Sequence, residues 1–340
     1  MIKQNLNVDN DTAYKDRDCF SIRVPTHTET FSAGTIDVYV YENEDKMGTA
    51  SAIALAGEQC RLVKENDTAS MIIMAAPSAC AFYNTYVQMA KISERLQAAI
   101  KKTHFFQFDD YILPFHHPAS FRFLLYNNFF AEISKYYDPG KVHMFNADSP
   151  DIEKTCREYG KLIMQHGPDL QLKGTGENGH WGYHEPDIPL TGECEFIRVT
   201  LSEENIAQQM RDHPRLFPSP ETVPREACTA NVPLFMRTRE RIEDNIPQLR
   251  KAFALLAAYG NDTVDKAVPS SMLKKHHNAV VRTTKDAAWA LIDYREKGKV
   301  TAAMLDHLSE TLALGTDKDV KAILHHIKSI FDRMKIEYDT

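Results

Sequence analysis

Short apolar runs alternate with longer segments of helical periodicity along the first part of the chain. The runs at 35–41, 70–76 and 104–108 are rich in β-branched, aromatic or other apolar residues, as buried parallel strands are. The segments 47–64 and 81–100 carry small and apolar residues at helical spacing. This order predicts an α/β fold with an open, mostly parallel, doubly wound and Rossmann-like sheet flanked by helices.

The alternation continues toward the middle of the chain. Helices are predicted at 121–136 and 150–165, the second with Ser149 as N-cap before Pro150. Residues 170–173 are predicted to form a strand that leads into a glycine-rich segment. The strand and helix order therefore remains that of an α/β sheet.

The last third of the chain has a different pattern. Five of the 16 prolines fall between residues 211 and 233, which excludes a regular helix or central strand over most of that stretch and predicts a loop that could act as a lid. Beyond residue 286 the pattern is helical. Its apolar stripe predicts core packing or an oligomer contact and consists of Val320, Ile323, Leu324, Ile327, Ile330, Phe331 and Met334.

Composition and charge exclude several classes of protein. The chain has 340 residues, a net charge of −7 and an isoelectric point near 6.1, so no nucleic-acid partner is expected. Its first 18 residues are polar and no apolar window is long enough to span a membrane, so we expect no export signal and no membrane partner. Six cysteines without metal-ligand spacing indicate reduced thiols in a cytoplasmic protein.

A glycine-rich loop is the strongest local signal for a functional site. Gly174, Gly176, Gly179 and Gly182 surround His180, which indicates a tight backbone path that presents one imidazole. A glycine-rich turn whose histidine only caps another element is the alternative.

Three polar features follow predicted strands: Pro77 with Ser78, Asp109 with Asp110, and the loop at 178–185. Ligands of open α/β sheets bind outside the carboxyl ends of the strands, so we expect these features to converge on one site. An Asp-Asp pair after a strand could instead cap the next element.

The motifs of this chain, in this order and spacing, resemble the glucosamine-6-phosphate deaminase family. They are FQFDDY at 106–111, Pro114 with HPASF at 117–121, PDIE at 150–153 before CREY at 156–159, GENGH at 176–180, Glu185 with Pro186, VPREACT at 223–229, and VPSSML at 268–273 followed by His276, Asn278 and DAA at 286–288. The resemblance covers residues 35–290. It implies residues 1–34 as an N-terminal extension and 291–340 as a helical extension packed on the α/β domain.

The family converts glucosamine 6-phosphate and water to fructose 6-phosphate and ammonia without a metal or an organic cofactor, so neither is expected here. By resemblance, Asp109 moves a proton between C2 and C1, His180 opens the sugar ring by acid catalysis, and Glu185 holds the imidazole. The family loop often has an asparagine and then an aspartate where this chain has Glu177 and Asn178. The loss of the aspartate at 178 could impair the histidine. Either Glu185 or the neighbouring Glu177 could compensate.

The resemblance also indicates a phosphate site, with departures from the family pattern. Ser78 keeps a hydroxyl at a helix N-terminus, whereas Ala79 and Cys80 replace glycine and the second hydroxyl. Arg211 and Lys251 match the cations that hold phosphate, the second less closely. Two other departures are a polar stretch at 237–245 in place of an apolar strand, and Lys173 in place of a glycine. Lys173 could point its ammonium into the pocket, but we expect it to reach solvent.

The sequence therefore predicts a sugar-phosphate enzyme. By resemblance to the deaminases, we expect it to isomerise an aldose to a ketose with release of ammonia. The alternatives are a non-catalytic sugar-phosphate binder, or a lactonase or isomerase for another sugar phosphate, because 6-phosphogluconolactonases share the fold and a similar loop. A homo-oligomer is possible. The exact sugar phosphate, the effect of Asn178, the oligomeric state, and the roles of Lys173, Glu177 and the C-terminal helices stay open.

Overall fold

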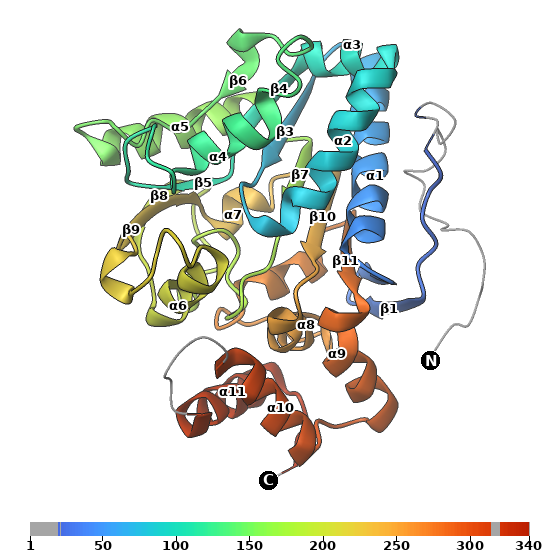
Figure 1. Ribbon diagram of the computed structural model, residues 1–340, viewed down its shortest axis with the longest axis vertical. Helices are drawn as coiled ribbons and strands as arrows, with labels where there is room; N and C mark the ends of the chain where they lie inside the picture. Colours follow the sequence, from blue (N-terminus) through green and yellow to red (C-terminus); the bar gives the residue numbers. More distant parts are fainter. Residues whose placement is uncertain (1–19, 21, 314–319, 340) are drawn as a thin grey trace.

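The computed structural model describes residues 20, 22–313 and 320–339, and its centre is an eight-stranded sheet (Figure 1). The strand order is β1-β2-β11-β10-β7-β3-β4-β6; β1 pairs antiparallel with β2, and the other neighbours pair parallel. The strands are β1 (Glu29–Ala33), β2 (Ile36–Tyr41), β3 (Ala69–Ile73), β4 (Thr103–Gln107), β6 (Val142–His143), β7 (Leu170–Lys173), β10 (Arg241–Ile246) and β11 (Ala279–Thr284). The predicted open, mostly parallel α/β sheet is confirmed.

Helices connect and cover these strands (Figure 1). The α-helices are α1 (Glu44–Asn66), α2 (Cys80–Ile92), α3 (Glu94–Lys102), α4 (Phe121–Leu125), α5 (Ile152–His166), α6 (Glu203–Asp212), α7 (Val232–Phe235), α8 (Ala252–Tyr259), α9 (Lys285–Lys297), α10 (Ala302–Ala313) and α11 (Val320–Met334). The alanine-rich α1 is buried over most of its length and packs on β2, β3, β10 and β11, because small side chains let helix and sheet approach closely.

Three predicted helices have different bounds. The segment 81–100 is two helices, because Ser93 adopts an extended conformation and its hydroxyl accepts from the amide of Leu96 to cap α3. The segment 121–136 is α-helical only through α4 and continues as a π-helical turn at Tyr126–Phe130. The N-cap of α5 is Asp151 rather than Ser149, since the Asp151 carboxylate accepts from the amide of Lys154 at 3.0 Å.

A second, three-stranded sheet was not predicted. It consists of β5 (Asp109–Tyr111), β9 (Glu226–Ala230) and β8 (Phe196–Thr200), all antiparallel, with β9 in the centre. The central strand lies inside the proline-rich stretch, whose prolines fall outside it. Because β5 follows β4 after a single residue, this sheet fixes the backbone of Asp109 at the carboxyl end of the large sheet.

Residues 241–245 of the polar stretch at 237–245 lie in β10, a buried strand in the middle of the large sheet. Its charges are neutralised by partners: Glu243 binds the guanidinium groups of Arg241 and Arg282, each at 2.6 Å. Asp244 binds the Lys173 ammonium at 2.6 Å. The expectation that Lys173 reaches solvent is therefore wrong, because its ammonium is buried against Asp244 and above the Trp181 ring.

The C-terminal helices α9, α10 and α11 confirm the helical pattern beyond residue 286. The predicted apolar stripe packs through its second half, with Ile327, Ile330, Phe331 and Met334 buried and α11 in contact with α8, whereas Val320 is 42% exposed.

None of the helices in the described part of the chain is long and apolar enough to cross a membrane. The predicted polar N-terminus, residues 1–18, and Cys19 lie outside the described residues; Cys60, Cys80, Cys156, Cys194 and Cys228 are free thiols.

Replacement of Lys173 by methionine tests the buried ion pair. Lys173→Met leaves the Asp244 carboxylate without its countercharge in the interior, so we expect the free energy of unfolding to fall by about 3–5 kcal/mol. The matched control is Lys154→Met, which removes an exposed pair with Glu158 and should change stability by less than about 1 kcal/mol. Urea unfolding followed by circular dichroism measures both, and equal effects would contradict the assigned role.

Candidate active site

A cavity of about 60 Å³ lies at the carboxyl ends of β3, β4 and β7. Its walls come from segments far apart in the sequence, among them Ser78, Asp109, Gly174, Gly176, His180 and Lys251. The three polar features that follow predicted strands therefore meet in one cleft. Gln208, Gln209, Asp212 and His213, which the sequence analysis did not single out for it, add to the polar lining.

The glycines of the loop make room for functional side chains. A Cβ atom on Gly174 would lie 2.7 Å from the Ser78 hydroxyl, and a Cβ atom on Gly176 would lie 2.1 Å from the His180 ring. Real Cβ atoms do not approach other atoms so closely. The predicted tight backbone path exists, and it allows the imidazole to lie flat against the chain.

The orientation of the His180 ring is set by Asn178. The Asn178 side-chain oxygen accepts from the backbone amide of His180 at 3.1 Å, which fixes which end of the amide faces the ring. The same oxygen lies 2.7 Å from Nδ1 of His180, so Nδ1 carries the proton and donates. This tautomer leaves Nε2 as the nitrogen that can accept a proton.

Glu185 acts on the histidine only through Asn178. Its carboxylate accepts from the Asn178 amide nitrogen at 3.3 Å, from the Ser202 hydroxyl at 3.1 Å and from the Asn205 amide at 2.6 Å. An asparagine suits this position because it accepts from the imidazole and donates to the carboxylate at once. Burial raises the pKa of Glu185, and these donors counteract part of that rise.

Glu177 does not contact His180. Its carboxylate binds the guanidinium groups of Arg211 and Arg250, and its backbone amide donates to the Gln208 side chain at 2.7 Å. The suggestion that Glu177 takes over the orientation of His180 is therefore wrong, because Asn178 occupies Nδ1. Arg250 was missed, since nothing in its local sequence distinguishes it from a surface cation.

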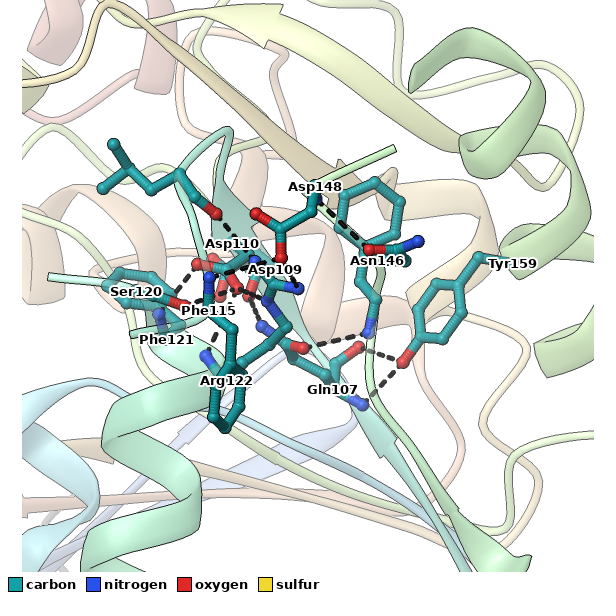
Figure 2. Close-up of polar contacts among 12 residues, drawn as sticks. Gln107, Asp109, Asp110, Phe115, Ser120, Phe121, Arg122, Asn146, Asp148 and Tyr159 are labelled. Carbon is teal, nitrogen blue, oxygen red and sulfur yellow. Dashed lines mark hydrogen bonds and ion pairs between the residues drawn. The ribbon is translucent and has the colours of Figure 1, made fainter. Parts of the chain in front are cut away.

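The two neighbouring aspartates have different tasks. Figure 2 shows the Asp110 carboxylate at the start of α4, where it accepts from the amides of Phe121 and Arg122 at 2.7 and 3.2 Å and from the Arg122 guanidinium at 3.1 Å. The capping alternative thus describes Asp110. Among the described residues, no group donates a hydrogen bond to the Asp109 carboxyl, which faces the cavity. Burial, and secondarily the Asp110 charge, raise the pKa of Asp109 well above its ordinary value.

A glutamine brace holds the backbone of Asp109. The Gln107 side-chain amide donates to the Asp109 carbonyl at 2.7 Å (Figure 2). Its side-chain oxygen accepts from the backbone amide of Phe145 at 3.0 Å. The Tyr159 hydroxyl accepts from the backbone amide of Gln107 at 2.7 Å and donates to the backbone carbonyl of His143 at 2.8 Å. This brace could not be found in the sequence, because its members come from separate elements.

The residues expected at the phosphate site are only partly brought together. Ser78 and Lys251 line the cavity, whereas Ala79 and Cys80 do not. The backbone amides of Ala79 and Cys80 already donate to the carbonyls of Ala76 and Pro77. Arg211 is held by Glu177 and lines a neighbouring cavity of about 260 Å³ between the loop and the C-terminal helices.

Burial lowers the pKa of two basic groups that line the cleft, His180 and Lys251. It lowers the pKa of His180 to about 3, with Lys251 and Lys173 contributing, so the imidazole is neutral near pH 7. It also lowers the pKa of Lys251, and the charge of Asp212 counteracts part of that fall. Among the described residues, the side chains that could hold a metal ion together lie elsewhere in the fold.

Known proteins resemble this chain in sequence and in structure, although no family model matches. It is 30% identical over 208 residues to the glucosamine-6-phosphate deaminase of Shouchella clausii, covering 60% of this chain and 80% of the relative. It is 30% identical over 233 residues to that of Thermoanaerobacter sp. strain X514, covering 68% and 87%.

Solved structures of related proteins also superpose on this chain. A monomeric glucosamine-6-phosphate deaminase of the NagB superfamily superposes with a TM-score of 0.64 at 25% identity, over 74% of this chain and 98% of that one. A 6-phosphogluconolactonase from Thermotoga maritima superposes with a TM-score of 0.56 at 16% identity, over 73% and 99%, and shares the fold.

A Cβ atom on Gly176 tests the close contact with the imidazole. In Gly176→Ala the His180 ring must move, and we expect overpacking to lower the free energy of unfolding by about 1–3 kcal/mol. Gly140→Ala is the control, since its new Cβ would meet one atom at 3.4 Å and should change stability by less than about 0.5 kcal/mol. Urea unfolding compares them; a Gly176→Ala protein as stable as the control would refute the contact.

Proposed function

Because this chain belongs to the glucosamine-6-phosphate deaminase family of the NagB superfamily, we propose that its cleft converts glucosamine 6-phosphate and water to fructose 6-phosphate and ammonia. The observation that carries the proposal is the Asp109 carboxyl, which is buried, faces the cavity and receives no hydrogen bond among the described residues. A carboxyl in this state is suited to take up and release a proton within the cleft.

Ring opening is assigned to His180. With Nδ1–H held by Asn178, Nε2 accepts the proton of the anomeric hydroxyl and returns it to the ring oxygen as the C1–O5 bond breaks. Glu185 positions the imidazole through the Asn178 amide and does not touch the substrate in this scheme.

Isomerisation and deamination are assigned to Asp109. The carboxylate removes the proton at C2 of the open-chain aldehyde and delivers it to C1, while one proton of the 2-amino group passes to O1. The 2-amino aldose thereby becomes the C2 imine of fructose 6-phosphate. Addition of water to the C2 imine and expulsion of ammonia then give the ketone of fructose 6-phosphate. The raised pKa of Asp109 suits both halves of the transfer, because the carboxyl must keep the proton taken from C2 until it delivers that proton to C1.

The phosphate of the substrate is assigned to Ser78 and Lys251, which line the cavity. Arg211 joins them only if its guanidinium exchanges Glu177 for phosphate, since it is paired with that carboxylate in the structure. The engaged amides of Ala79 and Cys80 leave the Ser78 hydroxyl as the main donor of this loop. A cytoplasmic location and homo-oligomer formation stay predictions.

A non-catalytic sugar-phosphate binder is the second candidate. It is favoured by the neutral Asn178 beside His180, because an amide does not increase the basicity of the imidazole as a carboxylate does. This candidate keeps the cleft and its phosphate ligands but lacks turnover.

Asp109→Asn tests the proposed base. We expect wild-type protein to release fructose 6-phosphate and ammonia in equal amounts, and the variant to lose about 10²–10⁴-fold in kcat, because an amide cannot accept the C2 proton. Asp306→Asn, an exposed acid on α10, is the control and should keep the wild-type rate. A coupled assay follows both products.

The same experiment separates the alternatives. If wild type turns nothing over but glucosamine 6-phosphate raises its melting temperature, the chain is a binder and the proposed reaction is wrong. Hydrolysis of 6-phosphogluconolactone, assayed in parallel, would assign the cleft to lactone chemistry instead.

The pH dependence of kcat tests the raised pKa of Asp109. A base is lost on protonation, so kcat should fall as the pH drops through a pKa well above 3.8, whereas His180, with a pKa of about 3, protonates at lower pH. Measuring kcat rather than kcat/KM removes the ionisation of the free substrate phosphate near pH 6. Activity recovered on return to neutral pH is the control for unfolding, and a kcat constant down to about pH 4 would contradict the assignment.

A further inference from the structure

We propose that His104, His143 and His166 form a binding site for a divalent transition-metal ion such as Zn²⁺. They come from three elements, β4, β6 and α5, and each is half-buried. Their ligand nitrogens all lie within 4.8 Å of one another. The site is separate from the cleft, because His104 is near the amino end of β4 and Asp109 follows its carboxyl end.

The distances between these imidazoles are close to those of a metal site. Nδ1 of His104 lies 3.0 Å from Nε2 of His143, and the two rings are parallel to within 1°. Two nitrogens on one tetrahedral Zn²⁺ are about 3.3 Å apart, so this pair needs little movement to share an ion. His166 is the last residue of α5 and its ring centroid is 4.1 Å from that of His104, so a rotation of its side chain brings in the third nitrogen.

The surroundings favour a metal over a charged histidine pair. Among the described residues, no carboxylate lies within ion-pair distance of any of the three rings, although the charges of Lys141 and Asp138 act on His104. Phe106 packs on His143 with ring centroids 4.7 Å apart. Burial lowers the pKa of all three imidazoles, so each is neutral near pH 7 and has one nitrogen lone pair. The proton in the hydrogen bond between His104 and His143 would move to the other nitrogen of its ring when an ion binds. Three neutral imidazoles suit Zn²⁺, Cu²⁺ or Ni²⁺, whereas Mg²⁺ and Ca²⁺ prefer oxygen ligands.

An ion at this site would join the elements that brace Asp109. His104 is three residues before Gln107 on β4, and the His143 carbonyl accepts from Tyr159 of α5, whose hydroxyl also binds Gln107. Metal binding should therefore stabilise the edge of the sheet through which Gln107 holds the Asp109 backbone. This inference does not depend on the proposed reaction, because binding and stability are measured without turnover.

Titration of the full, untagged chain with Zn²⁺ alone tests the proposal. After treatment with EDTA and dialysis, isothermal titration calorimetry at pH 7 should show one saturable site per chain, and Zn²⁺ should raise the melting temperature while Mg²⁺ does not. His143→Gln should weaken Zn²⁺ binding by at least about tenfold. His116→Gln, an exposed imidazole outside the cluster, is the matched control and should bind as wild type does.

A second variant keeps the test decisive if His143→Gln unfolds the edge strand. His166→Ala alters only the last residue of α5, and its far-ultraviolet circular dichroism should match wild type while Zn²⁺ binding falls as in His143→Gln. Substitution with Co²⁺ gives a visible absorption band that should depend on the same residues. If wild type takes up no Zn²⁺, or if the folded His166→Ala protein binds it unchanged, the three histidines are a packed aromatic cluster and the proposal is wrong.

Discussion

The buried ion pair between Lys173 and Asp244 connects the sheet to the loop that carries His180. The two residues are register partners on β7 and β10, and Lys173 is the last residue of its strand. Thr175 donates to the same carboxylate at 2.8 Å, and Ser270 bonds to the carbonyl of His180 and to that of Gly179. A charge pair without access to water tolerates little displacement, so the start of the loop is held at one place in the sheet.

Burial in the cleft favours the uncharged forms of both Asp109 and His180. The same loss of water raises the pKa of Asp109 and lowers that of His180, because in each case the charged form is the one destabilised. Asp110 lies beside Asp109 but is fully engaged by the start of α4 and by Arg122, so only one of the two carboxyls is available to a ligand. Of these two neighbouring residues, Asp110 therefore stabilises the fold, whereas Asp109 is free to act on a ligand.

The departures from the family pattern are connected in space. Asn178 accepts from His180 and donates to Glu185, which fits a neutral residue between an imidazole and a buried carboxylate. Glu177 binds Arg211 and Arg250, so the residue in the asparagine position of the family loop engages an arginine that the resemblance assigns to phosphate. The two loop changes therefore alter both the support of the histidine and the charge near the phosphate ligands.

The sequence by itself determined the α/β class, four strands of the large sheet (β2, β3, β4 and β7) and several residues of the cleft, because periodicity and motif spacing are local properties of the chain. Ser78, Asp109, His180 and Lys251 all line one cavity. Only the tertiary structure decided the burial of Lys173, the pairing of Glu177 with Arg211, the second sheet beneath Asp109 and the meeting of His104, His143 and His166. Each depends on partners between 23 and 120 positions away in the sequence. Whether a charge is exposed, paired or neutral is set by such partners and by the water they exclude.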